Sequence, residues 1–185
     1  MPDNNKNSSF VHLPAFRIAS IAIMIAVTAI FTTIIRIPTA PTRGYLNFGD
    51  VAIFFTAITF GPWTALIAGG AGTALADIIG GYAQWAPYTF IAHGGQGLVI
   101  GLIVYAGRKK TKGKTGIVSL IIAFVAASIV MTGTYFLTGG LMYGFGAAAT
   151  EIPGNILQNA AGILVGASLS AAVRKAYPPV STYGW

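Results

Sequence analysis

The chain has 185 residues, of which 55% are hydrophobic and only 8% are charged, and its mean hydropathy is +0.72. Soluble domains average about 25% charged residues, so this composition excludes an ordinary water-soluble protein and indicates one whose apolar side chains face lipid. The net charge of +7 does not indicate nucleic-acid binding, because the basic residues are clustered between apolar segments. The sequence contains no cysteine, which excludes disulfides and thiolate metal sites.

Apolar segments separated by short polar stretches predict an all-α integral membrane protein with six transmembrane helices. A helix must cross about 30 Å of hydrocarbon at about 1.5 Å per residue. In chain order, the predicted helices are 15–35, 48–60, 63–79, 88–107, 117–137 and 152–174. The second is short for a crossing, so five helices with one re-entrant segment is the alternative. We expect loops at 36–47, 80–87, 108–116 and 138–151.

The helices are predicted to form one domain, residues 15–175, between polar tails at 1–14 and 176–185. With the N-terminus inside the cell, nine of the eleven Lys and Arg residues lie on the inner side, as the positive-inside rule requires. The exceptions are Arg36 and Arg43. The sequence therefore predicts an N-in, C-in protein of a prokaryotic plasma membrane, with Asp50, Asp77 and Glu151 at the outer side.

Polar side chains share faces on two of the predicted helices. Asn155 and Asn159 lie four residues apart at the outer end of the last helix, and His93 and Gln96 lie three apart in the fourth. Amides and histidine are expensive to expose to lipid. Two interpretations are open, a hydrogen-bonded zipper between helices and a binding site for a neutral heterocycle or polyol.

The first predicted helix carries a face of small residues. Five alanines follow one another at spacings of four and three, which places them on one side of the helix. Small side chains let a second helix approach closely in lipid. The partner is either another helix of this chain or a separate membrane subunit. The alanines are Ala15, Ala19, Ala22, Ala26 and Ala29.

No pattern in the sequence indicates catalysis. It contains no Ser/His/Asp arrangement, no paired carboxylates and no histidine cluster. We therefore expect a protein that is not an enzyme and that binds neither a metal nor a cofactor.

Several short motifs follow in a fixed order along the chain. They are N-F-G-D after the first loop, F-G-P before the third helix, A-D near its end, W-A-P before the fourth helix and P-G-N-x-x-Q in the last. Together they resemble the substrate-binding S components of energy-coupling factor (ECF) vitamin transporters. The similarity is closest to the riboflavin-type group, which includes carriers of hydroxymethylpyrimidine and pyridoxine, and it covers roughly residues 15–175.

The resemblance implies a subunit that binds one vitamin-like molecule near the extracellular face. Such a subunit works with a transmembrane coupling protein, which would contact the alanine face, and with two cytosolic ATPases. In this family the first loop acts as a lid, and helices 4 to 6 supply most ligand contacts. Carried over to this sequence, the implied substrate-binding residues are Tyr45, Asn47, Trp85, His93, Gln96, Tyr135, Asn155 and Asn159.

One departure from the family pattern bears on the substrate. Members often read K-G-x-E-G in the fourth helix, whereas this chain reads H-G-G-Q-G. We therefore expect a neutral pocket for a small hydroxylated heterocycle such as hydroxymethylpyrimidine or pyridoxine. The alternatives are riboflavin, a self-sufficient channel or secondary transporter, and a structural membrane scaffold.

Overall fold

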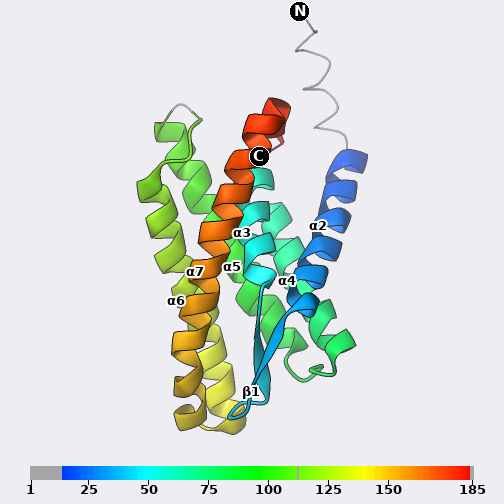
Figure 1. Cartoon of the computed structure of the whole chain (residues 1–185), viewed down its shortest axis with the longest axis vertical. Coiled ribbons are helices and arrows are strands. Elements are labelled where there is room, and N and C mark those ends of the chain that lie inside the picture. Colours follow the sequence, from blue (N-terminus) through cyan, green and yellow to red (C-terminus); the bar gives the residue numbers. More distant parts are fainter. Residues whose placement is uncertain (1–13, 112, 184–185) are drawn as a thin grey trace, which may run out of the picture.

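The structure, a computed structural model, describes residues 14–111 and 113–183, so the predicted N-terminal tail up to residue 13 and Lys112 lie outside the described residues. Six α-helices and one antiparallel hairpin make up this part of the chain, followed by a short 3₁₀ helix (Figure 1). Their bounds are α2 Pro14–Ile34, β1 Arg36–Thr39, β2 Gly44–Asn47, α3 Gly49–Phe60, α4 Pro62–Gly80, α5 Ala86–Lys110, α6 Ile117–Tyr143, α7 Phe145–Ala176 and η1 Pro178–Thr182.

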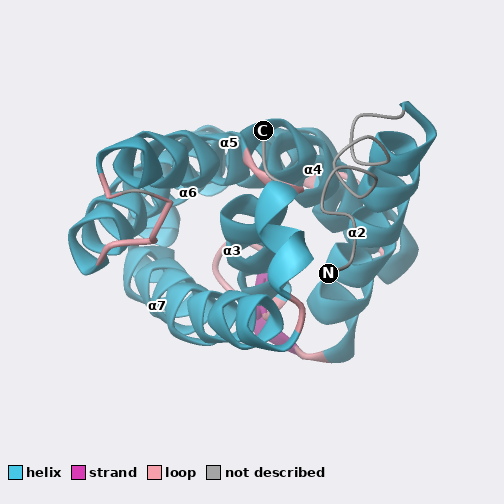
Figure 2. Ribbon diagram, turned by 90° about the horizontal axis from the view of Figure 1, so that it is seen from above, coloured by secondary structure: helices cyan, strands magenta, loops and turns pink. Residues whose placement is uncertain are grey.

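Five of these helices are long and apolar enough to cross a membrane, and α3 is the exception. Its 12 residues span about 18 Å at 1.5 Å per residue. Ten of them are buried, because α3 lies inside a ring of the longer helices (Figure 2). A helix that is apolar on every side belongs in such a position. β2 leads directly into α3 and lengthens its path through the bundle.

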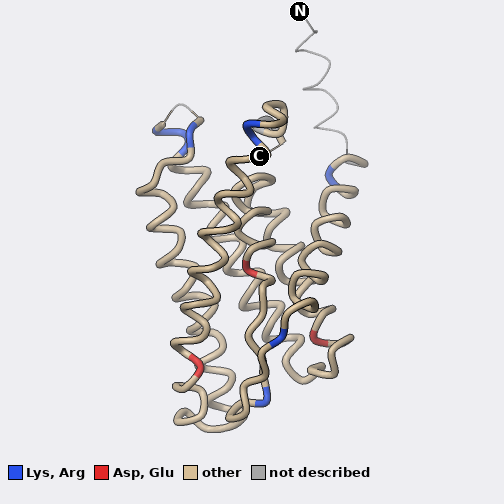
Figure 3. The backbone as a smooth tube through the Cα atoms, in the orientation of Figure 1, with Lys and Arg blue, Asp and Glu red and all other residues tan. Residues whose placement is uncertain are grey.

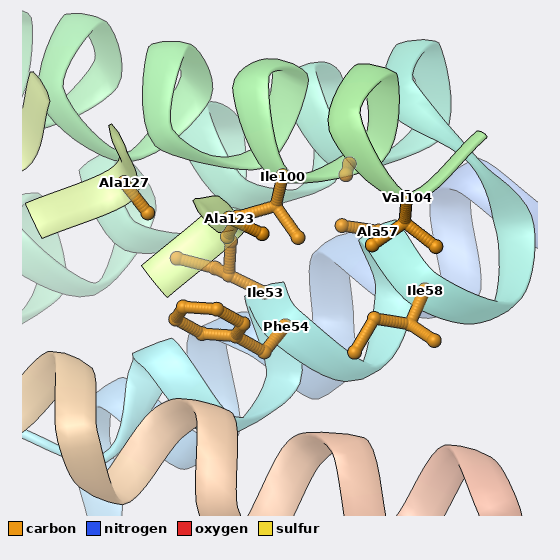
Figure 4. Close-up of a cluster of buried hydrophobic side chains, with 9 residues drawn as sticks. Ile53, Phe54, Ala57, Ile58, Ile100, Val104, Ala123 and Ala127 are labelled. Atoms are coloured by element: carbon orange, nitrogen blue, oxygen red, sulfur yellow. The ribbon is translucent and has the colours of Figure 1, made fainter. Parts of the chain in front are cut away.

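The apolar core surrounds α3 at its inner half. Ile53, Phe54 and Ala57 of α3 meet Ile100 of α5 and Ala123 of α6, and all five side chains are almost completely buried (Figure 4). Alanine dominates the α6 side of this cluster, so α6 can lie close to α3. Packing at short range is what holds helices together in lipid.

Glycines bring α5 against the start of α4. A Cβ atom built on Gly101 would lie 2.4 Å from the Cα of Pro62, which is backbone and cannot rotate away. A Cβ on Gly97 would lie 2.7 Å from the carbonyl oxygen of Ala65. These close contacts fix the rotation of α5, so its polar face points toward α3 and α7.

Alanine at Gly101 is expected to lower the unfolding temperature of the protein in detergent, because overpacking costs roughly 1–3 kcal/mol. Gly133 in α6 provides a matched control, since nothing lies within 4 Å of a Cβ built there. Alanine at Gly133 should leave the unfolding temperature unchanged or raise it slightly. Equal unfolding temperatures for the two variants would contradict the close packing of α4 and α5.

Two predicted loops are more ordered than the sequence indicates. The segment 36–47 forms the β1–β2 hairpin, with Arg36 paired with Asn47 and Thr39 with Gly44. The predicted loop 138–151 is almost entirely helical, and α6 and α7 are separated only by Gly144. Gly144 has φ of 94°, a conformation that glycine adopts without strain. The glycine and tyrosine content of the segment 138–151 is typical of a loop, but its tertiary contacts favour helix.

Charged residues are separated along the bundle, as the sequence predicts (Figure 3). Most described Lys and Arg residues lie at the end that holds the α5–α6 connection and the end of α7, while the acidic residues lie toward the hairpin. Arg108 and Arg174 both donate to the carbonyl oxygen of Ile58, at 2.6 and 2.9 Å. They thereby satisfy the C-terminal end of the short helix α3, whose dipole favours cations.

Candidate functional site

A small polar cavity lies beneath the hairpin, between the outer ends of α4, α5, α6 and α7. Its volume is about 30 Å³, which has room for a few water molecules at most. Ligand sites usually measure about 300–1,000 Å³, so the cavity in this structure is smaller than a typical ligand site. It is lined by Gly44, Tyr45, Asn47, Asp77, Trp85, Thr89, His93, Met131, Tyr135, Glu151, Asn155 and Gln158.

The hairpin is fastened over the cavity at its tip and along β2. At the tip, the Thr42 hydroxyl donates to the Glu151 carboxylate of α7. At the other end of β2, the backbone N–H of Asn47 donates to Oε1 of Gln158 at 2.8 Å. These bonds join residues more than a hundred positions apart in the chain. Each is a single hydrogen bond, worth roughly 0.5–1.5 kcal/mol, and together they hold the hairpin against α7.

Tyr45 of β2 connects the hairpin to α4. Its phenol donates to Oδ1 of Asp77 at 2.6 Å, and its ring packs on Tyr82 with centroids 4.6 Å apart. Burial, and after it the neighbouring Asp77 carboxylate, raises the pKa of the Tyr45 phenol above its usual value. The phenol therefore keeps its proton at neutral pH and remains a hydrogen-bond donor.

Aromatic rings form one wall of the cavity. Trp85 stacks on Tyr143 at 5.8 Å and meets Tyr135 edge-on at the same centroid distance. Tyr135 in turn meets the imidazole of His93 at 5.7 Å and donates its hydroxyl proton to Thr89 at 2.9 Å. Such a wall suits a flat ring, because offset-stacked and edge-to-face aromatic pairs are each worth about 0.5–1.5 kcal/mol beyond their buried area.

A directional chain of hydrogen bonds runs behind the cavity. Nδ2 of Asn159 donates to the backbone carbonyl of Asn155 at 3.0 Å, so Oδ1 of Asn159 is the acceptor. It receives Nε2 of Gln96 at 2.7 Å, which leaves Oε1 of Gln96 to face Nδ1 of His93 at 2.8 Å. Because a backbone carbonyl can only accept, each amide in the chain has one possible orientation.

The consequence of this chain is that Nδ1 of His93 carries a proton. Oδ1 of Asp50 lies 3.2 Å from the same nitrogen and is also an acceptor. Both neighbours of Nδ1 therefore require a donor there, and Nε2 of His93 is the nitrogen left for the cavity. It makes no hydrogen bond among the described residues. The His93 side chain is thereby fixed in position and tautomer, a common requirement for selective binding.

Asp50 is the most deeply placed carboxylate of the described chain. It is completely buried at the start of α3, beneath the cavity, and Gly162 of α7 packs directly against its Cβ. Apart from the contact with His93, its oxygens make no hydrogen bond among the described residues. A buried carboxylate is stable only beside a compensating donor, so Asp50 and His93 act as a pair.

The predicted binding residues occupy two positions relative to the cavity. Six line it: Tyr45, Asn47, Trp85, His93, Tyr135 and Asn155. Gln96 and Asn159 do not line it but lie behind His93 as members of the hydrogen-bond chain. The amides Gln96 and Asn159 therefore form the interhelical zipper that the sequence offers as one interpretation, and binding of a heterocycle or polyol in the cavity stays a prediction.

Two carboxylates in the wall were not predicted as site residues. Asp77 and Glu151 line the cavity, whereas the sequence predicts a neutral pocket. The signal that could have identified them is their rarity: the chain has four acidic residues, three of them in or beside apolar segments. An ionisable residue at membrane depth is a functional-site candidate by default. Within the described residues, no three His, Cys, Asp or Glu side chains are grouped to hold a metal ion.

The alanine face of α2 remains largely uncovered in the structure. Ala15, Ala19, Ala22 and Ala26 are exposed, and Ala29 is half-buried. The opposite face carries the buried Thr28, which contacts α4 at Gly72. The four exposed alanines therefore contribute little to packing within the described part of the chain.

The fold and the site together define the class of protein to which this chain belongs. This is a multi-pass protein of the plasma membrane with a hairpin-covered polar cavity near its outer end. Residues 14–175 match the family described as the S component of the ECF-type riboflavin transporter, and the chain belongs to this family. The family comprises subunits of transporters, not enzymes, and its S components bind a vitamin-like substrate and work with a coupling subunit and ATPases.

Two curated relatives cover most of this chain. A Pyrococcus woesei protein described as an uncharacterized protein in the gap 3′ region is 37% identical over 149 residues, which is 80% of this chain and 95% of the relative. The thiamine precursor transporter HmpT of Lactococcus lactis subsp. cremoris (strain MG1363) is 30% identical over 160 residues, or 86% of this chain and 88% of the relative.

Proposed function

We propose that this S component captures a small vitamin precursor, hydroxymethylpyrimidine, for import by an ECF-type transporter. The observation that carries the proposal is a cavity lined by amides, histidine and aromatic rings in a chain that is 30% identical to a thiamine precursor transporter. The aromatic wall of Trp85 and Tyr135 would contact the faces of a pyrimidine. Asn155, Gln158 and His93 would supply hydrogen bonds to its edge.

Pyridoxine and riboflavin are the competing substrates. Pyridoxine is a single ring of similar size, whereas riboflavin carries three fused rings and a ribityl chain. A closed cavity of about 30 Å³ must widen far more for riboflavin than for a single ring. The small volume of the cavity thus favours a single-ring compound over the ligand in the family's name.

Titration of the purified full-length subunit with the three vitamins tests this order. We expect hydroxymethylpyrimidine to bind at least about tenfold more tightly than pyridoxine, a difference of about 1.4 kcal/mol, and riboflavin to bind most weakly. Tighter binding of riboflavin or pyridoxine would overturn the proposed substrate. If none of the three binds, and a reconstituted subunit transports solute without ATPases, the self-sufficient transporter is the better account.

The alanine face of α2 is proposed as the contact for the transmembrane coupling subunit. Support comes from its exposure along four successive alanines and from its place in a chain whose family works with such a subunit. Ala22 lies in the middle of this face, on the opposite side of α2 from the α4 contact. Close helix approach in lipid depends on small side chains, and a leucine there would hold the partner away.

Leucine at Ala22 is expected to leave substrate binding by the isolated subunit unchanged and to reduce ATP-dependent uptake at least about tenfold. Ala106, an exposed alanine of α5, provides the matched control. Leucine at Ala106 should leave both binding and uptake unchanged. Normal uptake by the Ala22→Leu variant would show that the coupling subunit docks elsewhere.

A further inference from the structure

We propose that Asp77 recognises a substrate N–H group, so that the cavity selects an amino-substituted nitrogen heterocycle over its oxo or anionic counterparts. The proposal rests on the proposed function and specifies which chemistry the site reads. Asp77 lies near the end of α4, is 2% exposed and lines the cavity.

The two oxygens of Asp77 are in different situations. Oδ1 accepts the hydrogen bond from Tyr45 at 2.6 Å. Oδ2 is buried and makes no hydrogen bond of regular geometry among the described residues, and the Thr89 hydroxyl is the one other side chain besides Tyr45 that hydrogen-bonds this carboxylate. An unsatisfied buried acceptor is costly, more so when it belongs to a charged group. A ligand that brings an N–H to Oδ2 removes this cost, whereas a ligand that brings a carbonyl oxygen increases it.

A second unsatisfied group belongs to another residue that lines the cavity. Nε1 of Trp85 is buried without a hydrogen-bond acceptor among the described residues, and Trp85 lines the cavity. Indole nitrogen is only a donor, so it requires an acceptor on the ligand. The cavity therefore lacks one donor and one acceptor. An aminopyrimidine carries both, because its amino group donates and the neighbouring ring nitrogen accepts.

The charge around the cavity also favours a neutral or N–H-bearing ligand over an anionic one. Asp77 and Glu151 line it and Asp50 lies beneath it, whereas none of the described residues that line it is a Lys or Arg. The guanidinium of Arg36 lies over the Tyr45 ring at 5.1 Å and donates to the carbonyl of Ala76. A carboxylated or phosphorylated ligand would meet like charge in a poorly solvated site, an arrangement that excludes wrong ligands.

A matched pair of ligands tests the proposal on the full-length subunit. The pair is hydroxymethylpyrimidine, which carries an amino group, and its oxo analogue, in which a carbonyl replaces that group. In its lactam form the analogue exchanges the two groups, since its carbonyl accepts and its neighbouring ring N–H donates. A site built for the first order of donor and acceptor rejects the second by large factors. We expect the wild-type protein to bind the amino compound at least about 100-fold more tightly. Equal binding of the two compounds would overturn the proposal.

The variant Asp77→Asn tests the role of Asp77 directly. If Asp77 bonds the ligand, the variant changes the preference for the amino over the oxo compound, which a purely structural residue would not do. The amide keeps the size of the carboxylate and can accept from Tyr45 with its oxygen while its NH₂ faces the ligand. We expect the preference for the amino compound to fall about 100-fold or to reverse. Thr150→Val is the control, because Thr150 is exposed, does not line the cavity and donates to the carbonyl of Ala147 in its own helix, and this variant should keep the wild-type preference.

The outcomes separate this proposal from the proposed function. If the wild-type protein binds both pyrimidines equally, or if Asp77→Asn keeps the full preference, the role of Asp77 is refuted while the assignment to a pyrimidine stands. If the wild-type protein binds neither, the proposed function itself fails. Since the comparison of the two compounds uses the wild-type protein, the proposal stays testable even if Asp77→Asn does not fold.

Discussion

Leucine at Asn159 is expected to lower the affinity for substrate by at least about 100-fold while the protein still folds. Asn159 is fully buried and joins Gln96 to the backbone carbonyl of Asn155. Leucine fills a similar volume but leaves two polar groups without partners, at roughly 1–3 kcal/mol each. Gln96 can then turn its amide, and the tautomer of His93 is no longer fixed. Calorimetric titration together with thermal unfolding measures both effects.

The control for Asn159 is a lipid-facing position on the same helix. Leu164 is 70% exposed, so alanine there should change neither affinity nor folding. Wild-type affinity in the Asn159→Leu variant would show that the hydrogen-bond chain serves only to pack α5 against α7. Loss of folding in that variant would point the same way, toward a structural role.

Cross-linking the hairpin tip to α7 is expected to prevent substrate from entering almost completely. The native chain has no cysteine, so the pair Thr42→Cys and Glu151→Cys gives a single defined link when treated with a short bifunctional thiol reagent. The native side chains are hydrogen-bonded, which places both positions within reach. Because the cavity is smaller than a usual ligand site, capture of the proposed substrate would require the hairpin to move first. Association of labelled substrate should fall at least about 100-fold and recover on reduction.

The cross-linking experiment has its control at the opposite end of the bundle. The rings of Tyr177 and Tyr183 are in contact with centroids 6.2 Å apart. Cysteines at these two positions, linked by the same reagent, should leave substrate association unchanged. Unchanged association in the protein linked between Thr42 and Glu151 would mean that substrate enters by another route and that the hairpin is a fixed part of the wall.

Much of the fold follows from patterns within single segments. Long apolar segments predict membrane helices because lipid leaves the backbone few other conformations, and the positions of Gly61 and Pro62 between α3 and α4 match a helix boundary. The face shared by His93 and Gln96 was predictable from helical spacing alone. The orientation of the bundle was predictable from charge, and the Lys and Arg residues of the described chain are segregated accordingly.

What could not be predicted depends on contacts between distant segments. The hairpin at 36–47 has two prolines and looks like a loop, but its strands are held by bonds to Gln158 and Glu151, over a hundred residues away. The carboxylates of Asp77 and Glu151 lie in different helices, and only the packing of α4, α7 and β2 brings them to one cavity. Helical spacing relates residues within a helix, so it cannot show which faces meet.

The small molecule that co-purifies with the subunit tests the central claim most directly. The subunit is expressed in cells supplied with hydroxymethylpyrimidine, pyridoxine and riboflavin, purified in detergent, denatured, and the released compounds are identified by mass spectrometry. We predict hydroxymethylpyrimidine in near-equimolar amount with the wild-type protein and at background level with Asn159→Leu. Release of riboflavin or pyridoxine instead, or of hydroxymethylpyrimidine equally from both proteins, would contradict a pyrimidine site supported by the Gln96–Asn159 chain.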